Sequence, residues 1–173
     1  MIEIRKSTAD DLEGFIQLLR HVKEAMTNPE WFYLDSPEEV REMFADGTMD
    51  LWVAMDGERL AGAFDVLYPG LQSFNYGYTV GMAQEELLKV VNMDTAAVHP
   101  DYRGQGLQRK LMAYAEKALA EGGERILMCT VHPDNRYSLQ NVLSQGYQIV
   151  STRPMYGSVR HVLKKFSNNQ KNS

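Results

Sequence analysis

The chain has 173 residues, of which 44% are hydrophobic and 24% charged, the proportions of a soluble globular protein. This length favours one domain with a core of its own, which we place at residues 1–166, with a frayed tail at 167–173. Cys129 is the single cysteine, so no disulfide forms within the chain and we expect a reducing compartment. There is no apolar run of about 20 residues and no secretory signal, which excludes a membrane-bound protein and predicts a cytoplasmic one.

The charge is unevenly distributed along the chain. Residues 1–86 carry 6 Lys and Arg against 17 Asp and Glu, a net charge of −11, whereas residues 87–173 carry 12 against 6, a net charge of +6. A total of −5 argues against nucleic-acid binding, which needs a basic stripe. The two halves suit a cationic ligand and an anionic ligand, respectively. The alternative is a solvated surface whose charge is merely uneven.

The first elements predicted in the chain are a strand and two helices. Residues 1–7 alternate apolar and polar side chains, which indicates a short strand. Thr8 and Asp10 are both candidate N-caps for a helix that follows. Its apolar positions recur at helical spacing: Leu12, Phe15, Ile16, Leu19 and Val22. Ser36-Pro37-Glu38-Glu39 combines an N-cap, a proline at the first helical position and a capping box, so it predicts the start of a second helix.

The middle of the chain predicts a hairpin, an irregular segment and another strand. Apolar runs at 51–55 and 60–68 are joined by Asp-Gly, a hairpin signal. Residues 71–89 are rich in aromatic residues and glycine, with a helical turn at 84–88. Residues 90–99 form the next strand, which ends at a proline.

The C-terminal part alternates helices and strands. The predicted elements are a helix from Leu107, a strand at 125–131, a helix at 135–143 and strands at 148–151 and 159–166. Strands interspersed with helices, without a repeat or a linker, predict a mixed α/β domain.

A glycine-bearing turn at 103–106 joins the strand at 90–99 to the helix that starts at Leu107. Glycines let the backbone approach a ligand closely, and the first amides of a helix have no partner inside it. Together with the positive helix end and Arg103, these amides form an anion site suited to a phosphate or diphosphate. The turn matches neither the GxGxxG nor the P-loop fingerprint. The alternative is a plain strand-to-helix turn.

The segment VHPDYRGQGLQRKLM resembles the acetyl-CoA signature of the GNAT superfamily of N-acetyltransferases, Gln/Arg-x-x-Gly-x-Gly/Ala. Arg103 and Gly106 fill its first and fourth positions, whereas Gln108 replaces the usual small sixth residue. Residues 132–147 are similar to the later family motif, Asn-x-x-Ser/Ala followed by Gly-Phe/Tyr. The resemblance implies a mixed, mostly antiparallel sheet of about 6–7 strands flanked by about 4 helices. It also implies acetyl transfer from acetyl-CoA to a primary amine of a small cationic molecule or a protein, by direct attack in a ternary complex.

The resemblance also implies positions that bind acetyl-CoA. The backbone around the pyrophosphate would be that of Arg103, Gly104, Gln105, Gly106, Leu107 and Gln108. Val98 matches the position whose N–H polarises the thioester carbonyl. Asn135 and Ser138 match positions beside the pantetheine arm. For Asn135 a helix N-cap is an alternative role, and both roles are compatible.

Aminolysis of a thioester needs a group that takes a proton from the amine. Asp94 lies four residues before Val98, so strand alternation puts both side chains on one face. It is our candidate for the general base, with a structural ion pair as the equal alternative. His132 is a second candidate for base or substrate contact, although a hydrogen-bonded structural histidine is favoured.

The family often has a tyrosine seven residues after the motif asparagine, where it acts as general acid. Here this position is Val142. Tyr137 is a substitute candidate, but we favour departure of the thiolate without an acid, because a thiol of pKa about 8.5 leaves readily. Cys129 in an apolar strand is interpreted as a small hydrophobe and not as an acetyl carrier.

Other functions remain in competition with acetyl transfer. The absent tyrosine at Val142 supports a catalytically weak acetyl-CoA-binding regulatory domain. The acidic balance disfavours acetylation of aminoacyl-tRNA. We expect no metal, because no His, Cys or Asp cluster has ligand spacing. A homodimer is left open.

Overall fold

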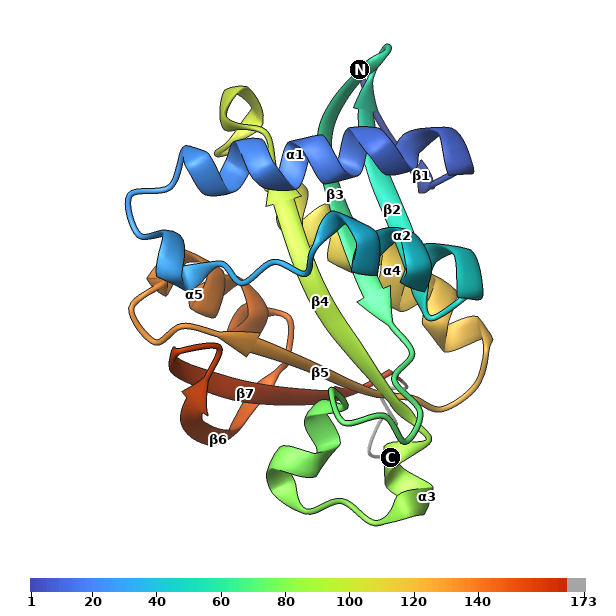
Figure 1. Cartoon of the computed structure of the whole chain (residues 1–173), viewed down its shortest axis with the longest axis vertical. Helices are drawn as coiled ribbons and strands as arrows, with labels where there is room; N and C mark the ends of the chain where they lie inside the picture. The colour runs from blue at the N-terminus through green and yellow to red at the C-terminus, as the bar shows by residue number, and fades with distance from the viewer. Residues whose placement is uncertain (168–173) are drawn as a thin grey trace. The chain divides into compact units, whose positions relative to one another are not determined.

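The computed structural model describes residues 1–167, in which it has seven strands and five α-helices (Figure 1). Its chain falls into two compact units. The first comprises Met1–Leu67 and Asp94–Ala115, and the second comprises Tyr68–Met93 and the chain from Glu116 onward. Strand β4 (Val90–Val98) belongs to both, and the strand order is β1-β2-β3-β4-β5-β7-β6. The mixed, mostly antiparallel fold is therefore confirmed, whereas the extent of the single domain stays a prediction.

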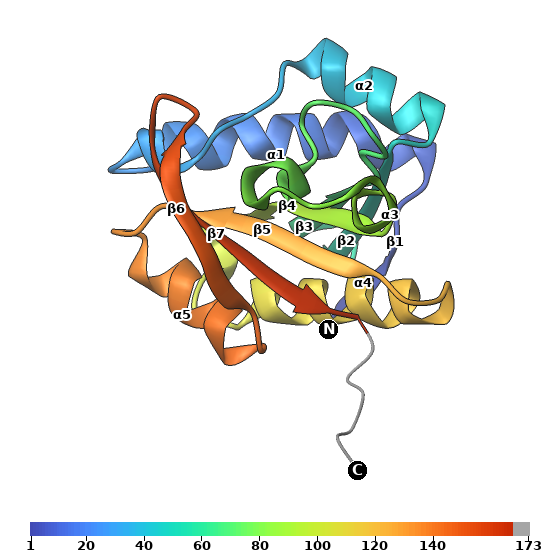
Figure 2. The same cartoon turned by 90° about the horizontal axis from the view of Figure 1, so that it is seen from below.

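The first unit is built on an antiparallel meander of β1 (Ile2–Lys6), β2 (Met49–Asp56) and β3 (Arg59–Leu67). Figures 1 and 2 show α1 (Leu12–Glu24) and α2 (Pro37–Asp46) on one face of these strands and α4 on the other. Helix α4 spans Leu107–Glu121, and its first part belongs to this unit. The unit therefore has a layer of strands between two layers of helix.

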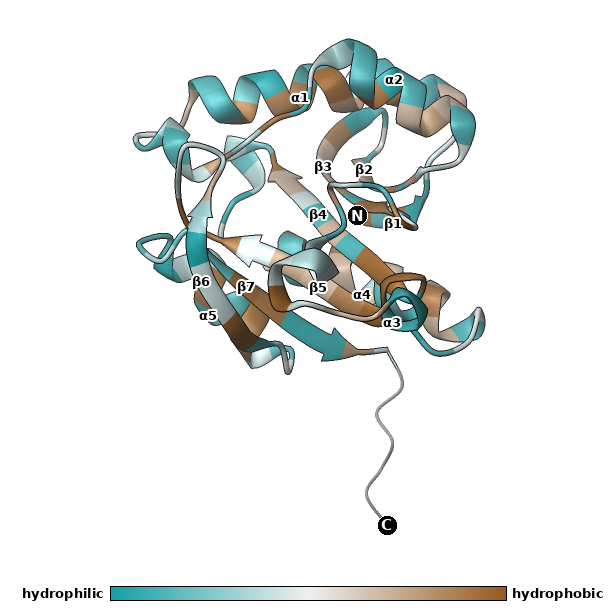
Figure 3. Cartoon of the chain, turned by 60° about the horizontal axis from the view of Figure 1, so that its bottom comes forward, coloured by the Kyte–Doolittle hydropathy of each residue, from teal (hydrophilic) through white to brown (hydrophobic). Residues whose placement is uncertain are grey.

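The helices of this unit follow their sequence signals. Hydrophilic and hydrophobic residues alternate along α1 (Figure 3), and the buried ones are Phe15, Ile16, Leu18, Leu19 and Val22. The Ser36 hydroxyl accepts a bond from the Glu39 N–H at 3.2 Å, and the Glu39 carboxylate accepts one from the Ser36 N–H at 2.8 Å. Gly47 ends α2 with a φ of 82°, which favours glycine. The predicted capping box is thus confirmed.

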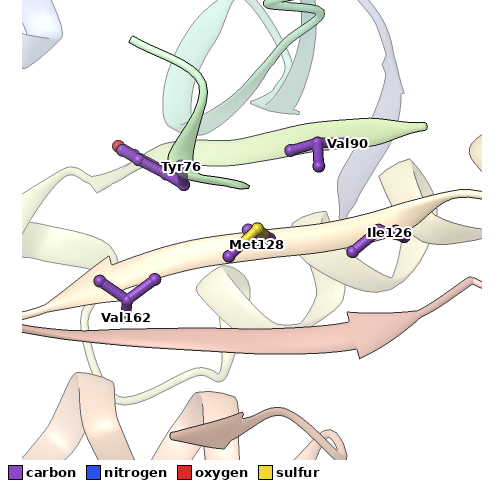
Figure 4. Close-up of a cluster of buried hydrophobic side chains, with 5 residues drawn as sticks. All are labelled: Tyr76, Val90, Ile126, Met128 and Val162. Atoms are coloured by element: carbon purple, nitrogen blue, oxygen red, sulfur yellow. The ribbon is translucent and has the colours of Figure 1, made fainter. Parts of the chain in front are cut away.

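The second unit continues the sheet from the start of β4. Strand β5 (Ile126–Val131) is parallel to it, β7 (Ser158–Phe166) is antiparallel to β5, and β6 (Gln148–Met155) pairs with β7. Its helices are α3 (Gln84–Leu87), α5 (Arg136–Ser144) and the end of α4. Buried side chains from three strands and the aromatic segment form a cluster, drawn in Figure 4: Tyr76, Val90, Ile126, Met128 and Val162.

Two segments of this unit differ from the expectation. Strand β6 continues to Met155, although we expected it to end at Ser151 before Pro154. Because β6 is the last strand in the order, a proline there removes no bond that another strand needs. The aromatic segment contains a 3-10 helix, Tyr76–Val80, that the sequence pattern did not indicate.

The end of the described chain is tied to the start of β5. The Ser167 N–H donates to the Arg125 carbonyl oxygen at 3.0 Å, and the Arg125 N–H donates to the Ser167 hydroxyl at 2.8 Å. The rest of the predicted tail, residues 168–173, lies outside the described residues. In residues 1–167, no helix is long and apolar enough to cross a membrane.

Candidate functional site

The glycine turn lies between a short 3-10 helix, Pro100–Tyr102, and the start of α4. Gly104 and Gly106 have φ angles of 79° and 69°, where side chains other than glycine are strained. Apart from the adjoining residues of the chain, no heavy atom lies within 4 Å of the place that a β-carbon would take on either glycine. The backbone conformation, and not crowding, therefore requires glycine at both positions.

The 3-10 helix before this turn is fastened to the β2–β3 hairpin. Arg59 forms an ion pair with Asp101, and the Tyr102 hydroxyl donates to Asp56 Oδ2 at 2.9 Å. The Arg59 guanidinium also lies 5.2 Å from the centroid of the Tyr102 ring. The hydrogen bond from Arg59 lowers the pKa of Asp101, and that from Tyr102 lowers the pKa of Asp56. These contacts hold the entry of the turn in place.

The turn presents the features of an anion site. Helix α4 has 15 residues, and the first N–H groups of a helix have no acceptor within it. Arg103 is exposed beside them, and Leu107 is buried, which anchors the helix start in the core. The side chain of Gln108, the departure from the usual small residue, is half-buried. Backbone donors, a helix dipole and a guanidinium together fit phosphate oxygens.

Asp94 and Asp65 lie on neighbouring strands, and both accept a hydrogen bond from the same residue, Thr95. Asp65 Oδ1 accepts from the Thr95 N–H at 2.7 Å, and Asp94 Oδ2 accepts from the Thr95 hydroxyl at 3.1 Å. Exposure alternates along this part of β4, with Asp94 and Val98 half-buried and Thr95 buried. Asp65 is only 3% exposed. Burial, and next the charge of Asp94, raise its pKa well above the ordinary value.

Asp35 adds a third carboxyl group, from the loop before α2. Burial raises its pKa to about 6, and the charges of Asp94 and Glu39 add to the effect. In the part of the chain that the structure describes, this carboxyl forms no ion pair or hydrogen bond. Since Asp65 also senses the charges of Asp94 and Asp35, the three groups form one electrostatic cluster.

Two members of this cluster, Asp35 and Asp65, were not predicted from the sequence. Asp65 had a signal, because it is a charged residue inside the apolar run 60–68 that becomes β3. Asp35 had none, since an acidic residue next to a helix cap is ordinary. Only in the folded chain does the charge of Asp94 act on it.

The second unit contains the remaining candidates. The Asn135 side chain accepts a bond from the Ser138 N–H at 3.4 Å, so Asn135 is the N-cap of α5, as one of its two predicted roles requires. His132 Nδ1 accepts from the Asp134 N–H at 3.1 Å, and its Nε2 lies 3.2 Å from the Ser158 hydroxyl. Both ring nitrogens are thus engaged, which favours the structural interpretation of His132.

The candidates for acid and acetyl carrier have different surroundings. Tyr137 is 65% exposed, whereas Val142 is 2% exposed and faces the interior. The different surroundings of positions 137 and 142 agree with departure of the thiolate without an acid, which stays a prediction. Cys129 is buried, and burial raises the pKa of its thiol. A protonated buried thiol is a poor nucleophile, which agrees with a hydrophobic role.

Comparisons with known proteins agree with the described fold. Residues 18–147, three quarters of the chain, match the model of the Acetyltransferase (GNAT) family. An N-acetyltransferase of Staphylococcus aureus Mu50 is 12% identical with a TM-score of 0.74, over 97% of this chain and 99% of that chain. The yncA protein of Salmonella typhimurium, solved with its cofactor acetyl-CoA, is 16% identical with a TM-score of 0.72, over 100% and 98%.

A plant structure is similar to the same extent. The NAA60 protein of Arabidopsis thaliana, in complex with acetyl-CoA, is 16% identical with a TM-score of 0.72, over 96% of this chain and 98% of that chain. A search of curated proteins finds no match. Residues 1–167 contain no group of three or more His, Cys, Asp or Glu side chains that could hold a metal ion.

Proposed function

Because the chain belongs to the GNAT acetyltransferase family, and is thus an acyltransferase, we propose that it transfers the acetyl group of acetyl-CoA to a primary amine by direct attack in a ternary complex. The glycine turn at the start of α4 is the observation that carries the proposal. This turn matches the family signature, contains two glycines with a left-handed backbone conformation and exposes the side chain of Arg103. The acetyl-CoA complexes of yncA and NAA60 support the choice of donor.

Several residues receive proposed roles in binding the donor. Arg103 and the backbone from Gly104 to Gln108 hold the pyrophosphate, because a diphosphate is matched by helix-start amides and one cation. The N–H of Val98 polarises the thioester carbonyl. For Asn135 and Ser138 of the second unit, contact with the pantetheine arm rests on the motif alone.

The reaction requires the acceptor to lose protons in a defined order. The amine arrives as an ammonium ion and gives one proton to a carboxylate, for which Asp94 is the candidate base. The neutral nitrogen then attacks the thioester carbon, so a C–N bond forms and the C–S bond breaks. The sulfur departs with the electron pair of that bond and takes the second proton that the nitrogen sheds. No protein acid is needed, which is consistent with the exposed Tyr137.

A catalytically weak acetyl-CoA-binding regulatory domain is the second candidate. The buried Val142, at the position where the resemblance implies a tyrosine acid, favours it. Release of CoA thiol over a panel of primary amines separates the two functions. Transfer to any amine supports the enzyme, whereas tight binding of acetyl-CoA without transfer supports the regulatory domain.

The role of Asp94 is tested with Asp94→Asn, which keeps the shape and removes the base. We expect turnover to fall by about 10²–10⁴-fold while acetyl-CoA affinity stays within about twofold. The matched control is Asp10→Asn, at an exposed carboxylate of the same unit. A fall of less than about threefold in Asp94→Asn would assign the base elsewhere.

A further inference from the structure

The first unit contains a cavity of about 370 Å³ between α1 and the segment that leads into α2. Its volume lies within the range of about 300–1,000 Å³ that small-molecule sites occupy. Aliphatic side chains and Pro37 provide most of its wall, and charged ones complete it. The lining is Ile16, Leu19, Arg20, Lys23, Glu24, Leu34, Asp35, Pro37 and Val40.

The apolar part of the wall belongs to the core. Ile16, Leu19 and Val40 are buried, so these surfaces are held by the packing of α1 and α2. A cavity lined by aliphatic groups gains free energy from each methylene that it removes from water. The apolar wall thus fits an aliphatic chain.

Asp35 gives the cavity its polarity. It is a half-buried carboxyl group that is affected by the charges of Asp94 and Glu39, and within residues 1–167 it forms no ion pair or hydrogen bond, although Arg20 and Lys23 also line the cavity. A ligand with a positive charge relieves this repulsion and supplies the missing partner. Because the charge of Asp94, the candidate base, acts on Asp35, a cation held at Asp35 is also attracted by the group that takes its proton.

We infer that this cavity binds the acceptor as a primary alkylammonium ion, with its nitrogen at Asp35 and its aliphatic chain against Ile16 and Leu19. The inference rests on the proposed acetyl transfer, because it assigns the substrate class of the same reaction. An alkyl chain is favoured over a polyamine, since the wall already carries the cations Arg20 and Lys23, which repel a second ammonium group.

The charged groups around Asp35 determine the pH range in which its carboxyl group attracts a cation. Asp94 of β4 and Asp65 of β3 interact with it, Glu39 of α2 raises its pKa, and the cavity wall also carries Arg20, Lys23 and Glu24 of α1. With a pKa of about 6, the Asp35 carboxyl is ionised at neutral pH. Binding of an alkylammonium therefore weakens as the pH falls through this value.

The test measures CoA thiol release with n-propylamine, n-butylamine, n-pentylamine and n-hexylamine. We expect kcat/KM to rise by about fourfold for each added methylene. Spermidine is tested as a polyamine acceptor. As a competitor, 1-hexanol has the same alkyl chain without the charge, so we expect it to bind weakly. A lysine-containing peptide distinguishes a protein acceptor, whose side chain has the same chemistry, from a free amine.

Two variants test the charge of Asp35 and the space for the alkyl chain of the amine separately. Asp35→Asn lowers kcat/KM for n-hexylamine by about 10–100-fold, mainly through KM. Leu34→Phe, at a half-buried wall position, narrows the cavity and moves the preference to shorter amines. Glu42→Gln removes a charge from the exposed face of α2 and is the control that leaves the amine series unchanged.

The outcomes distinguish this inference from the proposed function. No transfer to any amine overturns the proposed function itself. Transfer with equal kcat/KM for short and long amines, with spermidine preferred, or with Asp35→Asn unchanged for n-hexylamine, overturns the acceptor site alone. A chain-length series that depends on Asp35 and Leu34 supports it.

Discussion

Asp35→Asn is expected to stabilise the protein, although it removes a charged group from the first unit. In the folded chain the pKa of Asp35 is raised from 3.8 to about 6, mainly by burial. A shift of about two units corresponds to about 3 kcal/mol at 1.36 kcal/mol per unit. Because the side chain is half-exposed, solvent screening reduces this to about 1–1.5 kcal/mol.

The sign of the effect follows from proton linkage. A carboxyl with a raised folded-state pKa binds its proton more tightly in the folded chain, so its contribution to stability is complete below about pH 4 and is lost as the pH rises through about 6. The asparagine carries no charge at either pH. The variant is therefore about 1–1.5 kcal/mol more stable than the wild type near pH 8 and equal to it near pH 4.

Urea unfolding at the two pH values measures this difference, and thermal melting should show a rise of about 2–6 °C at the higher pH. Glu42→Gln is the control, since exposed substitutions change stability by less than about 0.5 kcal/mol. Equal stability of Asp35→Asn and wild type at high pH, or a gain in stability that is the same at both pH values, would refute the raised pKa of Asp35.

Three further predictions concern the donor site and the residues that we exclude from catalysis. Gly106→Val places a branched side chain at a φ of 69°, so calorimetry should show at least tenfold weaker acetyl-CoA binding, and equal affinity would contradict the phosphate role. Tyr137→Phe should change turnover by less than about twofold, because the phenol is 65% exposed, and a hundredfold fall would make it the acid. The Cys129 thiol should react with a disulfide reagent only on unfolding, and rapid modification of the native chain would contradict its burial.

The fold was predictable where a signal is local. The capping box at Ser36, the Asp-Gly hairpin and the helical spacing of α1 each depend on neighbouring residues, and each is observed. The segment at 71–89 was not predictable in detail, because its conformation depends on distant side chains. The buried Asn92 accepts from the Tyr76 N–H at 3.3 Å and donates to the Phe74 carbonyl oxygen at 2.9 Å.

The candidate site also has a part that depends on local sequence and a part that depends on distant residues. The glycine turn could be predicted, because its chemistry lies in consecutive residues and a known motif. The cluster of Asp35, Asp65 and Asp94 could not, since its members come from a loop and two strands and only their folded positions couple them. Asp94 was proposed as the base because the family resemblance implies an acidic residue near this point and its spacing from Val98 puts both side chains on one face, but the sequence could not show which carboxylates interact with it.

The charge of the N-terminal half has a narrower meaning in the structure than in the sequence. Four of its acidic groups form ion pairs with nearby cations: Asp11 with Arg5, Asp50 with Lys6, and Glu13 and Glu38 with Arg41. Asp65 is held instead by a neutral N–H group, and Asp35 faces other carboxylates. The net charge of −11 already counts these cations, and Asp35 and Asp65 are the partly or fully buried acids that give an acceptor a local field. Such a field is screened weakly by salt, so a Michaelis constant for the amine that rises steeply with ionic strength would point to surface acids and away from Asp35.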